Sequence, residues 1–260
     1  MNTLQNLYAF LEANRAWNRA FQFREYRRHL SDCADAKARI TALLHMVAHT
    51  QSAPKLGSLA EFWKHLEKAN WKSAPSLTEL TEFIQQKSRL VTLSKTPWDR
   101  LFRALSTVPG WGPKTAALFV KCAIQLHRSK HTELHFLSDP HSARRFAPTD
   151  RVYLPVDAVI KRISLELSVV GLGETFDSIN DKLHAQYSPD QMLVWDDLWF
   201  WGFFTQNSSK ANRSLGWNEA RFWGLLSTSK KDAKRVEQKC VEFLMLLEAL
   251  KTHHKLRTSS

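Results

Sequence analysis

The spacing of apolar residues along the chain predicts a mostly helical protein. Apolar side chains recur three and four positions apart, the interval that places them on one face of an α-helix. Within residues 1–30 this pattern predicts an amphipathic helix with arginines on its polar side. Further helices are predicted over residues 36–49, 59–69, 76–86, 98–106, 115–126, 158–170, 189–203 and 229–251. We therefore expect an all-α fold, with residues 252–260 as a frayed end.

Residues at the ends of these segments sharpen the prediction. Ser76 is followed three positions later by Glu79, which fits a capping box at a helix start. Gly171 is placed to end the helix that begins at residue 158. Between residues 127 and 151 the apolar pattern breaks, because this stretch is polar, basic and rich in histidine and proline. We interpret residues 127–151, the basic segment, as a long excursion on the surface.

The composition fits a folded chain and excludes several protein classes. With 43% hydrophobic residues among 260, the chain can bury a sizeable core, so intrinsic disorder is excluded. Its three cysteines are too scattered for a disulfide framework, a zinc site or a cysteine-ligated cluster, and they indicate a reducing compartment. The N-terminus lacks a signal-peptide pattern and no long apolar run occurs. We therefore expect neither export nor a membrane span, and a location in the cytoplasm, with the nucleoid, or in the nucleus.

The charge of the chain points to a polyanionic partner. Lys and Arg together number 37 against 25 for Asp and Glu, which leaves a formal net charge of +12. A basic balance of this size favours binding to nucleic acid, although general solubility is the alternative. Ten tryptophans and 15 phenylalanines supply side chains that can stack on exposed bases, but most of them are expected in the core.

The most informative stretch is Val108-Pro-Gly-Trp-Gly-Pro-Lys-Thr-Ala116, which lies between two predicted helices. Its two glycines allow a tight turn that presents backbone N–H groups, and Pro113 suits the first position of the following helix. Together with the positive end of that helix, these amides form a site for a phosphate that reads no base. The residues that we expect to contact phosphate are Gly110, Trp111, Gly112, Lys114 and Thr115, with Arg144 and Arg145 of the basic segment.

This stretch resembles the LPGVGxKTA motif of the helix-hairpin-helix DNA glycosylases of the endonuclease III type. A second motif of that family, an aspartate in the form VDTHVxR, is similar to Pro155-Val-Asp-Ala-Val-Ile-Lys-Arg162, which follows in the same order. The segment MLVWDDLWFWGFF from Met192 also looks like the late family helix that packs beneath that aspartate. Two motifs in the family order are more specific than either one alone.

The resemblance implies an activity and an architecture. It implies a glycosylase that flips a damaged or modified base out of duplex DNA. Neither the number of cysteines nor the spacing of the histidines supports a site, so we expect no cofactor or metal, and we expect a monomer. Lys114 occupies the position of the lyase lysine, which forms a Schiff base with the sugar and cleaves the strand by β-elimination. Asp157 would stabilise the positive charge that develops on the sugar. Gln51 is placed as the residue that fills the space of the flipped base.

On the family pattern, two helical subdomains flank a cleft that holds the DNA. Residues 36–126 would form a central subdomain that ends in the helix-hairpin-helix. Residues 1–35 and 127–260, with the basic segment, would form the second one.

The chain also departs from the family pattern. The interval between Lys114 and Asp157 is longer than in typical members, because of the basic segment. Thr and His after the aspartate are here Ala158 and Val159, and the C-terminal four-cysteine cluster is missing. Trp111 replaces a small apolar residue, either as a DNA contact or as a larger plug. Two alternatives stay open: a monofunctional glycosylase, and a catalytically silent DNA-binding protein that keeps the hairpin.

Other patterns favour structural roles. His45 and His49 lie one helical turn apart, but no third ligand accompanies them, so we expect packing rather than a metal site. The pair Gly171 and Gly173 lacks a preceding strand and a third glycine, which favours a helix stop over a dinucleotide loop. The aromatic cluster from Trp195 to Phe203 is expected mostly in the core.

Overall fold

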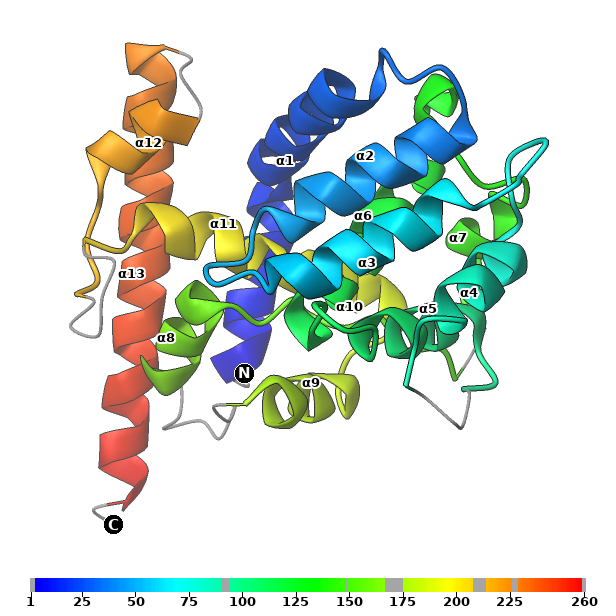
Figure 1. Ribbon diagram of the computed structural model, residues 1–260. Coiled ribbons are helices and arrows are strands. Elements are labelled where there is room, and N and C mark those ends of the chain that lie inside the picture. Colours follow the sequence, from blue (N-terminus) through cyan, green and yellow to red (C-terminus); the bar gives the residue numbers. More distant parts are fainter. Residues whose placement is uncertain are drawn as a thin grey trace. The chain divides into compact units, whose positions relative to one another are not determined.

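The computed structural model describes residues 3–89, 94–147, 149–166, 175–207, 214–225 and 229–258, and it is helical (Figure 1). Helix covers 69% of the described residues, and they contain no strand, only an isolated bridge between Gln206 and Leu215. The prediction of an all-α fold is therefore confirmed. None of the helices in these ranges combines the length and hydrophobicity that a membrane span requires.

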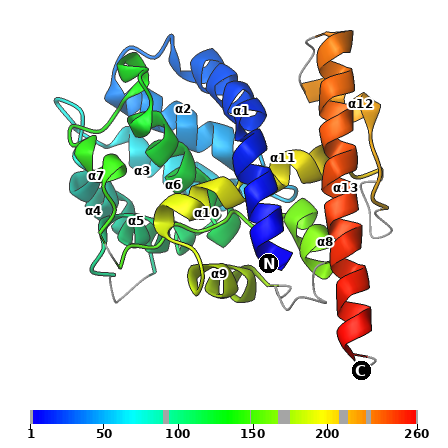
Figure 2. The same cartoon turned by 180° about the vertical axis from the view of Figure 1, so that it is seen from behind.

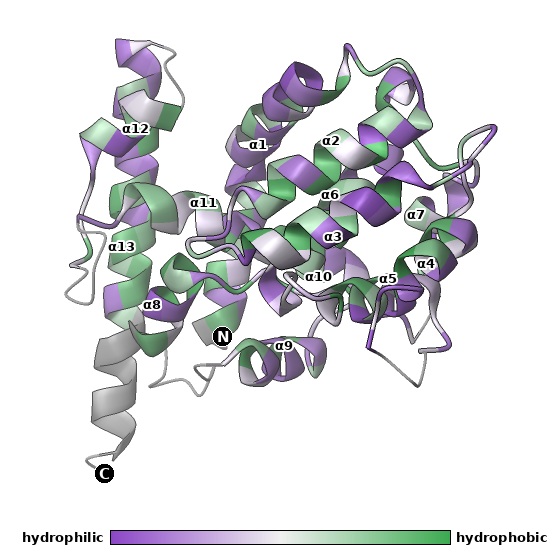
Figure 3. Ribbon diagram, viewed as in Figure 1, coloured by the Kyte–Doolittle hydropathy of each residue, from purple (hydrophilic) through white to green (hydrophobic). Residues whose placement is uncertain are grey.

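The long helices open and close the described chain, and shorter ones lie between them. Figure 2 shows α1 as one continuous helix. In Figure 3 most helices carry both hydrophilic and hydrophobic residues, as the apolar spacing predicts. In chain order the helices are α1 (Thr3–Leu30), α2 (Ala36–Ala48), α3 (Leu56–Glu67), α4 (Leu77–Gln85), α5 (Pro97–Ser106), α6 (Pro113–Arg128), the 3₁₀ turn η1 (Thr132–Leu134), α7 (His141–Arg144), α8 (Ala158–Glu166), α9 (Phe176–His184), α10 (Pro189–Trp195), α11 (Asp197–Phe204), α12 (Glu219–Leu225) and α13 (Lys230–Thr258).

The chain forms two compact units whose boundaries differ from the predicted ones. Unit 1 comprises Met1–Phe21 and Val156–Ser260, and unit 2 comprises Gln22–Pro155. The sequence predicts that the basic segment belongs with the C-terminal part, whereas the structure places it in unit 2. The reason is that the segment is not a mere surface excursion, since it buries Leu134, Phe136, Leu137 and Ala143. These side chains add to the core of unit 2 and outweigh the polar character of the segment.

Unit 2 is built around α6. This helix buries most of its residues, packs against α2, α5 and α7, and is the central element of the unit. The predicted capping box at the start of α4 is confirmed: Ser76 Oγ accepts from the amide of Glu79 at 3.1 Å, and the Glu79 carboxylate accepts from the amide of Ser76 at 2.6 Å. Its two hydrogen bonds satisfy backbone donors that the start of a helix otherwise leaves open.

Unit 1 packs α8 closely against α11. A Cβ atom on Gly202 of α11 would lie 2.7 Å from Val159 Cγ1, so a larger residue there would force side chains of α8 to move. Trp195 and Trp201 are fully buried, and Trp199 and Phe203 half-buried, as expected for a mainly structural cluster. The predicted end of the helix at residues 167–170, Gly171 and Gly173 lie outside the described residues.

Candidate nucleic-acid interface

The turn between α5 and α6, residues 107–112, has the tight geometry that its glycines predict. The amide of Trp111 donates to the carbonyl of Val108 at 3.0 Å, and Gly110 has φ of +90°. These features define a type II turn, which requires a residue with positive φ at the position of Gly110. A Cβ atom there would also lie 3.1 Å from the backbone nitrogen of Leu59. Conformation and space both select glycine at this position.

The α5–α6 turn leads directly into the first turn of α6. Gly112 is the N-cap, and Pro113 takes the first helical position, as predicted. The hydroxyl of Thr115 accepts from the amide of Gly112 at 3.2 Å and donates to its carbonyl at 3.0 Å. The amides of Trp111 and Gly112, both predicted to bind phosphate, thus have partners within the protein. The positive end of the α6 dipole is the part of the predicted anion site that this geometry leaves intact.

Lys114 and Gln51 tie the loop after α2 to this turn. Lys114 is half-buried, and its Nζ donates to the carbonyl of Thr50 at 2.9 Å and to Thr50 Oγ1 at 2.8 Å. The side-chain amide of Gln51 donates to the carbonyl of Gly110 at 3.2 Å. The structure therefore brings together Lys114, Gln51 and Gly110. The contacts of Thr50 were not foreseen, because no local pattern in the sequence links a loop residue to a lysine so far along the chain.

The side chain of Trp111 is a plug rather than a surface contact. It is 8% exposed and packs edge-on against Phe62 and Trp63, with ring centroids 5.5 and 6.2 Å away. Of the two predicted roles for Trp111, the structure favours packing. The rings of His45 and Trp63 stack with their centroids 3.9 Å apart. Burial and the neighbouring His49 lower the pKa of His45. The stacking contact gives His45 a packing role.

Asp157 lies in unit 1, at the start of α8. The carboxylate is half-buried, and its Oδ1 accepts hydrogen bonds from the amides of Val159 and Ile160, both at 2.8 Å. Asp157 therefore caps α8, the structural role that any aspartate at this position would serve. The two bonds also hold the carboxylate in one orientation.

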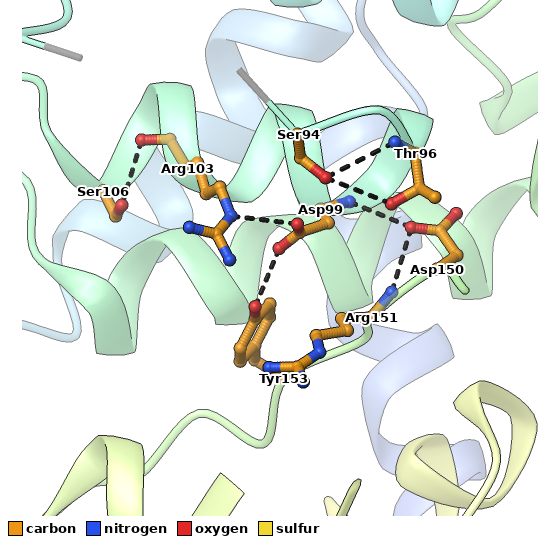
Figure 4. Close-up of polar contacts among 8 residues, drawn as sticks. All are labelled: Ser94, Thr96, Asp99, Arg103, Ser106, Asp150, Arg151 and Tyr153. Atoms are coloured by element: carbon orange, nitrogen blue, oxygen red, sulfur yellow. Dashed lines mark hydrogen bonds and ion pairs between the residues drawn. The ribbon is translucent and has the colours of Figure 1, made fainter. Parts of the chain in front are cut away.

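A buried polar network anchors the segment before Asp157 to α5 (Figure 4). Asp99, 4% exposed, accepts from Tyr153 Oη at 2.7 Å and from Arg103 Nε at 2.9 Å. Asp150 Oδ1 accepts from the amides of Asp99 and Arg151, at 3.1 and 3.0 Å. Burial first, and then the bond to Asp99, raises the pKa of Tyr153 to about 12. Burial likewise raises the pKa of Asp150 above its ordinary value.

This network was missed from the sequence, although one signal for it was present. An aspartate within the first turn of a helix, such as Asp99 in α5, is a common partner for the positive helix end. Arg103 is a local partner, one turn along α5, but Tyr153 comes from beyond the basic segment, and no periodicity predicts that pairing. The network fixes residues 150–153 on α5 and keeps this part of the chain in unit 2.

Arg144 and Arg145 are exposed, but the structure does not bring them to the α5–α6 turn. They lie at the end of α7, whose Ala143 carbonyl accepts from Arg128 Nε at the last residue of α6. The guanidinium of Arg128 also lies over the ring of Phe146, 4.3 Å from its centroid. The α5–α6 turn is at the other end of α6, and a helix of 16 residues is roughly 24 Å long. The two predicted phosphate-binding groups are therefore separated by the length of this helix.

Comparisons with family models, with curated proteins and with solved structures find no match for this chain. Among the described residues, no group of three or more His, Cys, Asp or Glu side chains is arranged to hold a metal ion. The resemblance to the helix-hairpin-helix glycosylases thus stands on the residues of the two motifs.

Proposed function

We propose that this protein is a DNA glycosylase of the helix-hairpin-helix class that removes a damaged or modified base and cleaves the abasic strand through Lys114. The observation that carries the proposal is the α5–α6 turn. Gly110 takes a positive φ at the position that the motif requires, and Lys114 follows in the first turn of a proline-started helix. The sequence motif and the local geometry agree at this turn. A basic composition or net charge alone would not produce that agreement.

The proposed chemistry assigns separate tasks to the two motifs. The positive end of α6 would hold a phosphate of the DNA backbone without reading a base. After base flipping, the Lys114 amine would attack the sugar C1′ while the C1′–N bond breaks and the base leaves. The C1′–O4′ bond then breaks as the nitrogen lone pair forms a C=N bond and O4′ takes up a proton, which gives the Schiff base. The Schiff base acidifies the C2′ proton, whose removal expels the 3′ phosphate by β-elimination. Asp157 would stabilise the positive charge on the sugar.

The resting contacts of Lys114 add a condition to this mechanism. Nζ makes two bonds to Thr50, and as an ammonium it has three N–H donors and no lone pair, so it must lose a proton before it can attack carbon. The neutral amine keeps two N–H donors, enough for both bonds to Thr50, and directs its lone pair at C1′.

A panel of duplex oligonucleotides tests the proposal. Each duplex carries one lesion: oxidised guanine, an oxidised pyrimidine, uracil, an alkylated purine or a mismatch. We expect one of them to yield an abasic product and, with borohydride, a covalent enzyme–DNA adduct. Excision without an adduct would favour the monofunctional alternative. Binding with no excision from any member would contradict the proposal.

Asp157→Asn separates chemistry from capping. Asparagine is as good an N-cap as aspartate, so the amides of Val159 and Ile160 keep an acceptor and α8 stays intact. We expect base excision to fall by roughly a thousandfold, the scale for loss of a charge that stabilises a transition state. Unfolding midpoints and DNA affinity should not change. Excision at the wild-type rate would leave Asp157 with the capping role alone.

The catalytically silent DNA-binding protein remains a second candidate, since specific contacts favour it. Lys114 is engaged by Thr50, and Asp157 by the start of α8, so each has a structural role that needs no chemistry. This candidate predicts salt-dependent binding to duplex DNA and no adduct with borohydride. It also predicts that Asp157→Asn leaves the affinity for every duplex unchanged and that neither protein excises a base.

A further inference from the structure

Thr50 presents two oxygen atoms to the Lys114 amine. Lys114 Nζ lies 2.9 Å from the carbonyl oxygen of Thr50 and 2.8 Å from its Oγ1, although the two residues are 64 positions apart in the sequence. A lysine ammonium has hydrogen-bond donors and no acceptor, so both oxygens of Thr50 accept. The fold thus places a pair of acceptors on the one amine to which the proposed chemistry gives a role.

The hydrogen of the Thr50 hydroxyl is engaged by α2. Thr50 Oγ1 donates to the carbonyl of Val47 at 2.8 Å. A hydroxyl has a single hydrogen, so while it donates to Val47 it can only accept from Lys114. The direction of this bond matters once the amine is neutral, because a hydroxyl with its hydrogen turned toward Nζ would donate to the nitrogen lone pair and mask the nucleophile. The bond to Val47 prevents that.

The backbone around Thr50 is held on two sides. The amide of Thr50 donates to the carbonyl of Val47 at 3.1 Å, and the Val47 side chain is fully buried. The next residue, Gln51, donates its side-chain amide to the carbonyl of Gly110 at 3.2 Å. The two oxygens that face the amine are therefore tied to the core of unit 2 and to the α5–α6 turn.

We propose that Thr50 is a positioning residue that aims the lone pair of the Lys114 amine. A neutral amine on a lysine has two N–H bonds and one lone pair. When the N–H bonds point at the two oxygens of Thr50, the lone pair takes the one direction that remains. A nucleophile aimed before the substrate arrives reacts faster than one that must be oriented in the complex. The inference rests on the proposed function, because it assumes that this amine attacks a sugar carbon.

The same contact has a second effect, of opposite sign. Hydrogen-bond acceptors stabilise a charged ammonium more than a neutral amine. Loss of the Thr50 hydroxyl should therefore let the amine release its proton at lower pH, while it also loosens the aim of the lone pair. A residue that only braces the loop would lower the amount of active protein and leave the pH dependence of the reaction where it was.

A duplex with a preformed abasic site tests the inference without base excision. The amine adds to the C1′ aldehyde, water leaves as the C=N bond forms, and cyanoborohydride reduces that bond to a stable adduct. The rate is measured at saturating DNA across a range of pH. For Thr50→Val we expect the plateau rate at high pH to fall about tenfold or more. The acid limb of the profile should move to lower pH by about one unit, the scale of one charge-assisted hydrogen bond.

Two matched variants control for the hydroxyl and for the fold. Thr50→Ser keeps a hydroxyl that can donate to Val47 and accept from Lys114, so it should restore the plateau and the acid limb. Thr41 of α2 donates its hydroxyl to the carbonyl of Lys37 at 2.8 Å, and Thr41→Val should leave both features at their wild-type values. Unfolding midpoints show that each variant is folded at the assay temperature.

Chemical labelling without DNA separates the inference from the proposed function. Formaldehyde and cyanoborohydride methylate lysine amines through an imine, and peptide mass spectrometry measures Lys114 by itself. In Thr50→Val the pH midpoint of Lys114 labelling should fall. The midpoint of Lys64, whose Nζ lies 2.9 Å from Glu61 Oε1, should stay unchanged.

Each outcome of these experiments decides one of the two claims. Trapping and labelling of Thr50→Val at wild-type rates would overturn the inference, and so would a lower plateau with an unmoved acid limb. If the wild type traps the abasic duplex with the expected dependence on Thr50 but excises no base, the inference stands and the glycosylase activity fails. If labelling responds to Thr50 but the wild type traps no abasic duplex, the aim at a sugar carbon is wrong, together with the proposed strand cleavage.

Discussion

The two ends of α6 differ in what they offer a polyanion. At the N-terminal end, a glycine turn, a helix dipole and Lys114 meet at one place, and the loop residues Thr50 and Gln51 hold them there. At the C-terminal end, cationic side chains surround a packed segment that contributes to the core, and Arg128 is engaged by the carbonyl of Ala143. The first end combines geometry with charge. The second has charge alone.

This difference shows why a run of basic residues is a poor guide to a binding site. In the sequence, the basic segment is the more conspicuous of the two regions. In the structure it buries His127 completely, together with apolar neighbours. These buried side chains show that part of the segment serves the core of unit 2, although Lys130, Arg144 and Arg145 stay exposed. The short turn, with a single lysine, places its motif on a fixed backbone.

Among the variants that test the difference between the two ends of α6, loss of the Lys114 amine is expected to have the largest effect, on adduct formation and strand cleavage. Lys114→Gln should abolish the borohydride adduct and strand cleavage completely, because glutamine can donate to Thr50 but cannot form an imine. Adduct formation is measured by gel shift on the lesion that the wild type excises, at low and moderate salt. Lowering the salt strengthens DNA binding, so an effect through phosphate contact alone would disappear there. Recovery of cleavage at low salt would therefore show that Lys114 only binds.

Gly110→Ala should have the next largest effect, through the backbone of the turn. An L-residue at φ of +90°, with its Cβ 3.1 Å from the Leu59 nitrogen, is strained, and we expect a stability loss of roughly 2 kcal/mol. Gly112→Ala is the matched control, since Gly112 has φ of −147° and no atom lies within 4 Å of the position that its Cβ would take. Urea denaturation measures both variants. Equal midpoints for the two would show that the turn is not held in this conformation.

The sequence predicted most helices of both units and the local chemistry of the turn. It did not predict α7, α9 or α12, and it predicted α10 and α11 as one helix. Capping, proline and glycine act within a few residues, so Ser76, Pro113 and Gly110 could be placed correctly from the chain alone. The predicted subdomain boundary was wrong for the basic segment. Its membership of unit 2 depends on a few buried side chains and on the bond between Tyr153 and Asp99, which no periodic pattern encodes.

The candidate site was predicted in the same uneven way. The residues of the motif were found, but not the contacts that hold them: Thr50 with Lys114, and Gln51 with Gly110. Nor did the sequence show that Trp111 is buried and Leu56 exposed. Both lie in short apolar stretches, and tertiary packing decides which side chains of such a stretch enter the core. The roles of Lys114 and Asp157 in catalysis stay predictions.

A pH effect on stability is expected from the C-terminal end of α6. Burial, and secondarily His135, lowers the pKa of His127 to about 3, below the ordinary value of 6.5 that applies when the chain unfolds. As pH falls below 6.5, the unfolded state takes up the proton first, so stability decreases by up to about 1.4 kcal/mol per pH unit until pH nears 3. Above pH 6.5 this histidine contributes no pH dependence.

His127→Gln isolates this contribution. Glutamine does not titrate but can accept from the amide of Phe136, as His127 Nε2 does at 3.4 Å. We expect a lower unfolding midpoint at neutral pH and a smaller drop between about pH 7 and pH 5 than in the wild type. An unchanged drop would mean that His127 titrates normally, which is incompatible with its burial in this segment.

Charge reversal at Arg144 and Arg145 should have the smallest effect, because these residues lie a helix length from the α5–α6 turn. If both contact DNA phosphates, the slope of log affinity against log salt should become shallower by about 0.9 for each phosphate that is no longer neutralised. Affinity should then fall equally for damaged and undamaged duplexes, while the borohydride adduct at saturating DNA stays at the wild-type level. An unchanged slope would remove the C-terminal end of α6 from the interface and leave the turn as the phosphate site in unit 2. Loss of the adduct at saturation would contradict the separation of the two ends, since side chains that contact only phosphate change how much DNA is bound and not the reaction of DNA already bound.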